Sequence, residues 1–398
     1  MERVPRTLIA TTMAYPHTGG ASTHIDALIG RLGAASAYAG VCEGERCFPT
    51  RAGRLGMLIA ALGNNDHYAV RLHIFMIDAL RKRIEEALRG DERIEIIHCH
   101  DHRAALAARR AVLKIGRLGH LRPAIVQTIH GPWLFELRQT GDAPEGGRQN
   151  AYVREHESAS FRAADGLIAV DSGQKQIAIE LGADPVRVTV IYNAVSLEEL
   201  EAAAVQPSTI EAEKPYFVVP RRLVPKTGVR FAVEAMAEIP KEKRPRLLVA
   251  GQGPQREELE GESARLGLAA WVRFLGPVPR DRLVPLMAGA AGVLVPSVPA
   301  GGVVEATSLA VIEAMALRVP AIASAIGGLA ELIQHERTGL LVPAANPALL
   351  AEAMVRVIDG RLPPDLIPAA RERVEKMLST GPWFESVLGV YRKALAAR

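Results

Sequence analysis

Apolar residues along this chain follow two alternating periods, one typical of buried strands and one typical of amphipathic helices. In the first half, short apolar runs predict strands at residues 6–12, 94–100, 124–130, 166–170 and 188–191. The segments between them have the spacing of helices, at residues 23–32, 103–122, 151–164 and 174–181. Strands that alternate with helices predict a parallel sheet covered on both faces.

The alternation stops between residues 195 and 214, which are rich in alanine and acids and contain Pro207 and Ser208. It then restarts, with strands predicted at residues 216–219, 246–251, 272–275, 292–295 and 319–324. We therefore predict an α/β protein with two Rossmann-like domains, whose parallel sheets face each other across a cleft. The expected divisions are residues 1–200, a linker at 201–214, a second domain at 215–380, and a C-terminal helix at 381–398.

The composition is that of an ordinary globular protein, with 398 residues, 48% hydrophobic and 23% charged. No apolar run approaches the roughly 20 residues of a membrane span, and residues 1–6 do not resemble a signal peptide. The three cysteines, Cys42, Cys47 and Cys99, are few and odd in number. These features predict a cytoplasmic protein without a disulfide framework.

One segment is strongly basic, because residues 103–122 contain six Lys or Arg and no acid. Apolar residues alternate with these charges, so the segment could lie on an anionic membrane, as a peripheral contact at the inner face, or face a phosphorylated acceptor. It could equally be the solvated face of a helix packed on a sheet. The net charge of +4 and an aromatic content of 5% argue against nucleic acid as a partner.

The most informative segment contains Glu305 and Glu313, separated by seven residues. Glu313 falls on the apolar face of a helix predicted at residues 307–317, where a carboxylate is rarely buried without a partner. Glu305 precedes that helix, where side chains and free backbone N–H groups can meet a ligand together. A short strand and the turn Gly327-Gly328 follow. Alternatively, Glu305 is a solvated loop residue and Glu313 a paired core acid.

Other candidate residues follow predicted strands, where ligands of parallel sheets bind. Gly19 and Gly20 would let a phosphate approach the helix that contains His24. His98, Cys99 and His100 precede Asp101, but strand alternation sends Cys99 to the opposite face. We therefore expect these three residues not to converge on a metal.

In the second domain, Arg221, Arg222 and Lys226 follow the first strand, where their charges suit a diphosphate. The turn from Gly251 to Gly253 follows the next strand, but position 256 is Arg, so the longer dinucleotide fingerprint is absent. His130 ends a strand in the first domain and precedes Gly131-Pro132, which is typical of either a site residue or a turn.

The basic loop, the two glutamates and the Gly-Gly turn resemble, in order and spacing, the nucleotide-sugar site of family-4 retaining glycosyltransferases, also described as group 1, which have the GT-B fold. The resemblance covers nearly the whole chain. In this family an arginine is usually followed five positions later by a lysine and then by glycine. Aligning on Gly228 gives Arg222 with Thr227 in the lysine position, whereas Arg221 to Lys226 restores the spacing, so the choice of arginine stays open.

The resemblance implies a role for each candidate residue. Glu305 and His130 would act at the donor sugar, and Glu313 would bind the ribose hydroxyls. The amides near Ser308 and Leu309 would take the diphosphate together with the arginine and lysine, and Gly251 and Gly253 would lie near the base. The glycine-rich loop of Gly19 and Gly20 would approach the donor, and the acceptor would touch residues from the set His24, His100 and Asp101.

The sequence contains no D-x-D triplet, which in other glycosyltransferases marks a diphosphate bridged by a metal. We therefore expect a retaining transfer from a nucleoside diphosphate sugar to a hydroxyl of a sugar, lipid or small molecule, without a cofactor or an essential metal. Two alternatives are a GT-B nucleotide-sugar epimerase or hydrolase, and a non-catalytic nucleotide-sugar-binding protein.

Overall fold

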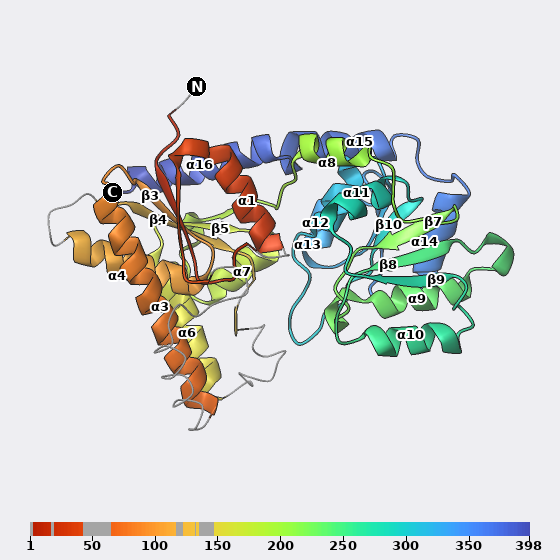
Figure 1. Ribbon diagram of the computed structural model, residues 1–398, viewed down its shortest axis with the longest axis horizontal. Helices are drawn as coiled ribbons and strands as arrows, with labels where there is room; N and C mark the ends of the chain where they lie inside the picture. The colour runs from red at the N-terminus through yellow and green to blue at the C-terminus, as the bar shows by residue number, and fades with distance from the viewer. Residues whose placement is uncertain (1–2, 17–19, 43–64, 117–121, 132, 135–146) are drawn as a thin grey trace. The chain divides into compact units, whose positions relative to one another are not determined.

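The computed structural model describes residues 3–16, 20–42, 65–116, 122–131, 133–134 and 147–398. The chain forms two compact units (Figure 1). The first contains Met1–Tyr192 together with Phe384–Arg398, and the second contains Asn193–Trp383. None of the helices among the described residues is long and apolar enough to cross a membrane.

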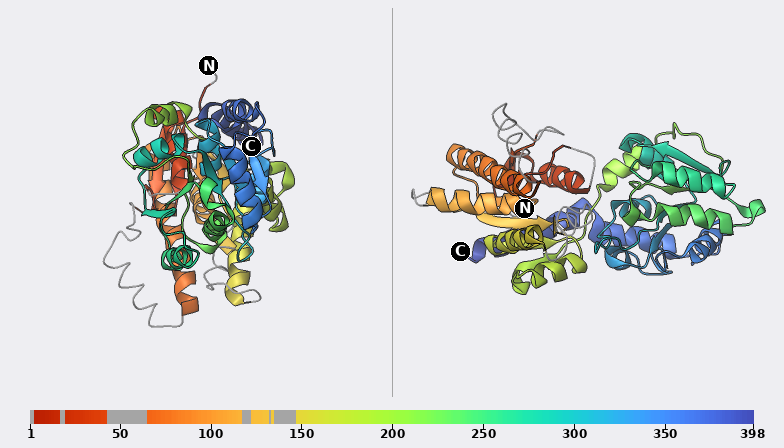
Figure 2. Two further views of the ribbon diagram at one scale, coloured as in Figure 1. Left: turned by 90° about the vertical axis from the view of Figure 1, so that its right-hand side faces the viewer. Right: turned by 90° about the horizontal axis from the view of Figure 1, so that it is seen from below.

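The first unit is built on a parallel sheet of six strands in the order β2-β1-β3-β4-β5-β6. The strands are β1 (Thr7–Thr11), β2 (Ser36–Gly40), β3 (Ile96–Cys99), β4 (Ala124–Ile129), β5 (Gly166–Ala169) and β6 (Val188–Val190). All residues of β1, β3, β4 and β5 are buried, because helices lie on both sides of the sheet (Figure 2). These helices are α1 (Gly20–Leu32), α3 (Asn65–Gly90), α4 (His102–Gly116), α6 (Arg148–Ala163) and α7 (Ser172–Glu180).

The second unit has a parallel sheet of six strands in the order β12-β11-β10-β7-β8-β9. The strands are β7 (Tyr216–Val219), β8 (Arg246–Ala250), β9 (Val272–Gly276), β10 (Gly292–Val295), β11 (Ala321–Ser324) and β12 (Leu340–Val342). Read from β9, this is the strand order of Rossmann domains. The order in which successive strands are added to the sheet reverses between β7 and β10, although all strands stay parallel. Loops that leave these two strands therefore diverge and open the crevice in which such sheets bind ligands.

The helices of the second unit complete its layers on both sides of the sheet (Figure 1). They are α8 (Leu197–Ala204), α9 (Val229–Glu238), α10 (Arg256–Arg265), α11 (Arg280–Ala288), α12 (Leu309–Ala316), α13 (Gly327–Leu332), α14 (Pro347–Ile358) and α15 (Leu366–Arg373). The last helix, α16 (Thr380–Ala396), begins in this unit and ends in the first. The segment predicted as a linker, residues 201–214, begins inside α8 and belongs to the second unit.

Three sequence expectations need correction or completion. The prediction missed β2 and β12, which are both edge strands. Cys42 is disulfide-bonded, which corrects the expectation of a reducing compartment without a disulfide framework. Cys99 is a buried free thiol.

The described part of the basic segment lies largely on α4. Most of this helix packs against α3, α6 and the sheet of the first unit. One face is buried through small and apolar residues that include Ala104, Ala108 and Val112. Lys114 pairs with Glu85 of α3 at 2.8 Å, while Leu113 is 49% exposed. Packing against the sheet therefore accounts for the amphipathic pattern, and contact with a membrane stays a prediction.

Histidines are concentrated in the interior of the first unit. His73 of α3 is buried, and its ring stacks on His102 and Trp133 at centroid distances of 5.2 Å for both. Within the described residues, neither ring nitrogen of His73 has a hydrogen-bond partner. Burial, with a smaller effect of His102, lowers the pKa of His73 to about 2. Burial also holds the pKa values of His98, His100 and His102 well below the usual histidine value.

Replacing His73 with phenylalanine should make the first unit less sensitive to acid. An unfolded histidine takes up a proton below about pH 6.5, whereas buried His73 does not, so wild-type stability falls as the pH falls. One such histidine lowers the free energy of unfolding by about 1.4 kcal/mol for each pH unit below 6.5. Between pH 6.5 and 5.0, the free energy of unfolding of His73→Phe should therefore fall by about 2 kcal/mol less than that of the wild type. Urea unfolding at both pH values measures this difference. Equal losses in the two proteins would contradict it.

Candidate functional site

Four polar side chains of the second unit meet where the loops that follow β7 and β10 diverge. The Arg221 guanidinium follows β7 and donates through Nη2 to Glu305 Oε2 at 2.7 Å. Its Nη1 donates to Ser308 Oγ at 3.0 Å, and Nη2 also contacts Ser297 Oγ at 3.2 Å. The side chains of Arg221 and Glu305 are only 12% and 13% exposed. An ion pair is therefore held in a largely desolvated crevice at the position where the fold binds ligands.

The Arg221 guanidinium also has a buried N–H group without a hydrogen-bond partner. Within the described part of the chain, its Nε is buried and has no hydrogen-bond partner. A buried donor without an acceptor costs free energy, and in native proteins it usually marks the place of a ligand or water. The guanidinium can thus bind Glu305 and Ser308 and still offer an N–H to an anionic oxygen.

The structure distinguishes the two arginines that the sequence left equivalent. Arg222 is exposed, whereas Arg221 points to Glu305 and Ser308. Thr227 is buried and donates through Oγ1 to the carbonyls of Arg222 at 2.6 Å and Val224 at 2.7 Å. The Thr227 side chain therefore stabilises the loop internally. Lys226, the preceding residue, is the lysine of this loop. The geometry favours the pair Arg221 and Lys226 with its spacing of five.

Two glycines of the neighbouring loop hold the Arg221 backbone in place. A Cβ on Gly251 would lie 1.9 Å from the Arg221 carbonyl oxygen, and one on Gly253 would lie 2.3 Å from that of Leu223. The Leu223 amide also donates to the Gln252 carbonyl at 3.0 Å. The role that this structure gives Gly251 and Gly253 is a close approach of two backbones, which only glycine permits.

Glycines fix the Glu305 loop in the same way. A Cβ on Gly327 would lie 2.3 Å from the Glu305 carbonyl oxygen, and one on Gly328 would lie 2.6 Å from the Ala306 carbonyl carbon. The Gly328 amide donates to the Glu305 carbonyl at 3.0 Å. Each member of the Arg221–Glu305 pair is thus positioned by a neighbouring segment that contains two glycines. For Arg221 this segment is the loop after β8, and for Glu305 it is the start of α13.

The helix after Glu305 begins at Leu309, with Ser308 as its N-cap residue. The Ser308 side chain does not cap the helix but accepts from Arg221, so the first backbone N–H groups remain available to an anion. Glu313 lies on this helix, is buried, and pairs with Arg280 at the start of α11. Burial raises the pKa of Glu313, while Arg280 opposes the shift.

Three residues of this region were missed by the sequence reasoning. Ser297 contacts Arg221 and Glu305, Arg280 pairs with Glu313, and Asn193 donates through Nδ2 to Thr307 Oγ1 at 2.9 Å. Ser297 follows β10, so its position at a strand end was a usable signal. Arg280 and Asn193 are distant in sequence from the residues that they contact, and no local motif indicates them.

In the first unit, Asp101 binds the scaffold. Its carboxylate accepts from Thr11 Oγ1 at 2.9 Å, from the Thr12 amide at 2.6 Å and from Thr12 Oγ1 at 3.0 Å. It also accepts from the Ala104 amide at 2.9 Å in the first turn of α4. These bonds join the loops after β1 and β3, and they leave the carboxylate little capacity for a ligand.

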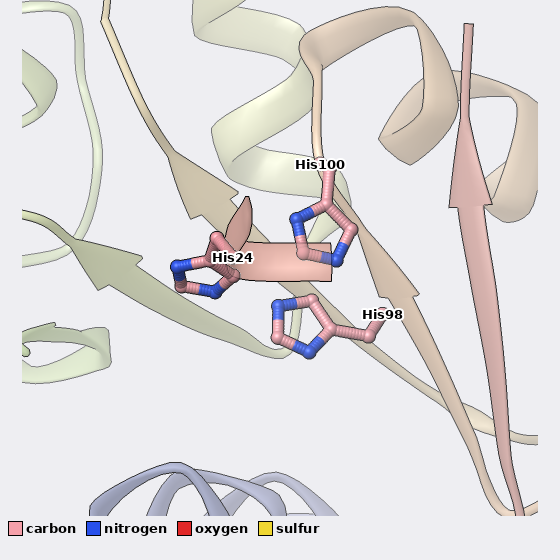
Figure 3. Close-up of side chains that lie close together, drawn as sticks. All are labelled: His24, His98 and His100. Carbon is pink, nitrogen blue, oxygen red and sulfur yellow. The ribbon is translucent and has the colours of Figure 1, made fainter. Parts of the chain in front are cut away.

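Four histidine side chains lie together at the carboxyl end of the first sheet. His98 and His100 leave one face of β3, and their stacked rings have centroids 4.6 Å apart. His24 of α1 points toward both of them (Figure 3). His130 follows β4, and its Nε2 lies 3.2 Å from His100 Nδ1. Burial lowers the pKa of His130 to about 4. Gly20 begins α1, and Gly19 lies outside the described residues.

These histidines change one expectation about metals. The strand sends Cys99 away from the two histidines, as its period predicts, but a third imidazole arrives from α1. The candidate ligand atoms of His24, His98 and His100 all lie within 4.8 Å of one another. The sequence reasoning considered convergence only among residues 98–100 and missed His24.

Two family descriptions match the chain, one in each half. "Glycosyltransferase Family 4" matches residues 18–199, and "Glycosyl transferases group 1" matches residues 202–373. Among curated relatives, a D-inositol 3-phosphate glycosyltransferase of Acidothermus cellulolyticus is 29% identical over 359 residues, which cover 84% of this chain and 74% of the relative.

Solved structures share the architecture over almost the full length. HepE of Anabaena, determined in complex with UDP, matches with a TM-score of 0.70 and 18% identity over 97% of this chain and 99% of that chain. Sucrose-phosphate synthase of Thermosynechococcus elongatus matches with a TM-score of 0.71 and 21% identity over 99% and 100% of the two chains. The chain belongs to the family-4, group 1 glycosyltransferases, and its two Rossmann-like domains have the GT-B fold.

Proposed function

We propose that this glycosyltransferase moves a sugar from a nucleoside diphosphate sugar to an acceptor hydroxyl with retention of anomeric configuration and without an essential metal. The observation that carries the proposal is the Arg221 guanidinium, held by Glu305 and Ser308 at the divergence of β7 and β10, with a buried Nε–H unpaired. A diphosphate oxygen is the acceptor that this donor lacks.

The leaving group is neutralised by fixed charges and dipoles. Arg221 offers its guanidinium, Lys226 a second positive charge, and the first amides of α12, near Ser308 and Leu309, the positive end of a helix. Because these groups are already oriented by the glycine-rich loops, they stabilise the developing negative charge with little reorganisation. The absence of a D-x-D triplet in the sequence is consistent with this arrangement.

In the reaction, the bond between the anomeric carbon and the diphosphate oxygen breaks through an oxocarbenium-like state. The acceptor oxygen bonds to the anomeric carbon on the same face, and its proton passes to the leaving phosphate. Glu305 positions the sugar and stabilises its positive charge. His130, with its lowered pKa, serves as a neutral imidazole at the reacting sugar.

The nucleoside is bound through its ribose. Glu313 accepts hydrogen bonds from the ribose hydroxyls, and Arg280 pairs with its buried carboxylate. Gly251 and Gly253 keep a supporting role beside the base. HepE was solved with UDP, which makes UDP the first nucleotide to test. We assign acceptor recognition to the first unit, with His24 and His100 as candidates and Asp101 as a residue of the scaffold.

A panel of UDP, GDP, ADP and TDP, each with EDTA and with magnesium, should identify the base. A nucleotide at about 100 times its dissociation constant stabilises the protein by about 2.7 kcal/mol. We expect one nucleotide to raise the melting temperature equally in EDTA and in magnesium, measured by differential scanning fluorimetry. A shift that requires magnesium would contradict the metal-free site, and no shift with any nucleotide would favour a non-catalytic protein.

Arg221 and Arg222 offer a matched pair of variants. Arg221→Gln should weaken binding of the preferred nucleoside diphosphate at least tenfold, because hydrogen bonds to a charged partner contribute about 1.5–3 kcal/mol. Arg222→Gln, which removes an equal charge from an exposed side chain, should change affinity less than threefold. Isothermal titration calorimetry measures both. Equal effects in the two variants would show that only net charge matters.

Glu305→Gln should lower kcat about 100-fold or more, whereas nucleotide affinity should fall far less, because the glutamine oxygen can still accept a hydrogen bond from Arg221. The substitution removes the negative charge that stabilises the sugar cation but keeps a side chain of the same size. Glu257→Gln, on the exposed face of α10, provides the control for loss of a carboxylate from the same unit. Product formation should be followed by mass spectrometry with and without acceptor, which separates transfer from hydrolysis. Unchanged turnover would remove Glu305 from the mechanism.

A further inference from the structure

The histidine cluster of the first unit has the geometry of a metal site, in addition to any role in acceptor recognition. His98 lies on β3 and His100 follows the strand directly, two residues later, and their stacked rings project from the same face of the sheet. Their ring planes are 12° apart, and His24 approaches edge-on, with centroids 6.5 Å from His98 and 5.3 Å from His100. One ligand nitrogen from each ring lies within 4.8 Å of the others (Figure 3).

We propose that His24, His98 and His100 bind one zinc ion, or a similar divalent ion of the first transition row, inside the first unit. All three proposed ligands belong to the first unit, whereas Arg221, Lys226 and the first amides of α12 belong to the second.

His100 presents a lone pair to this site. Its ring is 2% exposed, and within the described residues its Nε2 has no hydrogen-bond partner. Its other nitrogen, Nδ1, faces His130 Nε2 at 3.2 Å. With the proton on Nδ1, His100 donates to His130, and Nε2 is left as a bare acceptor. Ligating histidines in metalloproteins are held in this way by a hydrogen bond from the second nitrogen.

His98 has a comparable second partner. Its Nδ1 lies 2.7 Å from Tyr391 Oη, and its Nε2 lies 2.7 Å from Thr128 Oγ1. The Tyr391 contact can orient the ring, while a metal would take the place of the Thr128 hydroxyl on Nε2.

The ligand set selects the class of ion. Three imidazoles suit zinc, copper, cobalt or nickel, whereas magnesium and calcium require oxygen ligands. The nearest acid in sequence, Asp101, is engaged by Thr11, Thr12 and Ala104. Zinc–nitrogen bonds of about 2.0–2.1 Å place tetrahedral ligands about 3.4 Å apart, so the three rings would close by up to about 1.4 Å. Three protein ligands would leave the fourth position for water.

The bound ion would connect distant parts of the first unit. His24 comes from α1 and His98 and His100 from β3, while Tyr391 lies on α16 beside His98. Metal binding would therefore stabilise the packing of α1 against the sheet and lock the ring that Tyr391 contacts.

The test uses the untagged, full-length protein stripped with EDTA and dialysed. Zinc chloride is then added in equilibrium dialysis with elemental analysis, and cobalt chloride in a parallel titration followed by visible absorption. We expect one equivalent of zinc per chain, a tetrahedral cobalt spectrum, and a higher melting temperature with zinc. Less than a tenth of an equivalent on folded protein would overturn the proposal.

Two variants and one control locate the ion. His24→Gln and His100→Gln should each weaken zinc binding at least tenfold, while His335→Gln, an exposed histidine of the second unit, should leave it unchanged. Near-ultraviolet circular dichroism checks that each variant folds. Unchanged affinity in both folded variants would place the ion elsewhere and overturn the proposal. If neither variant folds, zinc X-ray absorption of the wild type decides by counting imidazole ligands, with three expected and none or one contradicting the site. Metal binding is measured without substrate, so its failure leaves the proposed transfer intact.

Discussion

The ion pair between Arg221 and Glu305 is the constraint on which the donor-site geometry depends. Two largely buried charges at 2.7 Å gain attraction but lose hydration, so such a pair contributes little net stability. Its value lies in orientation. Glu305 and Ser308 fix the guanidinium, and the remaining Nε–H is then directed without rotamer freedom. A site that must stabilise a leaving diphosphate benefits from donors that need not reorganise during the reaction.

That ion pair is held in place because the loop after β8 and the start of α13 approach the loops of Arg221 and Glu305 more closely than any side chain would allow. Gly251 and Gly253 touch the Arg221 loop, while Gly327 and Gly328 touch the Glu305 loop. A Cβ at Gly251 or Gly327 would meet a backbone oxygen at 1.9 or 2.3 Å, so even alanine would force the charged residue away. The glycines therefore set the backbone positions of Arg221 and Glu305, and a motif that resembles a nucleotide-binding turn also serves to position an arginine.

The sequence predicted the residues that follow strands, because the carboxyl ends of parallel strands share one edge of a sheet. Arg221, Glu305 and Ser308 were found this way, and Glu313 as an acid on the apolar face of a predicted helix, although their proposed functions stay predictions. Periodicity failed at β2 and β12, two of the edge strands, because β2 consists largely of small residues and β12 has only 3 residues. It also failed for pairs distant in the chain. The contact of Glu313 with Arg280 and the approach of His24 to β3 depend on tertiary packing, which no local pattern records.

The two units solve different electrostatic problems with different side chains. The proposed donor site of the second unit uses full charges, and Arg221 and Lys226 would be the fixed positive partners of a departing diphosphate. The first unit buries imidazoles whose low pKa values keep them uncharged, and neutral rings avoid the cost of an unpaired buried cation. In the proposed zinc site, the geometry of His24, His98 and His100 would let one nitrogen of each ring bind the ion. A zinc ion among His24, His98 and His100 would therefore coexist with a metal-free donor site, because each chemistry uses groups that the other cannot employ.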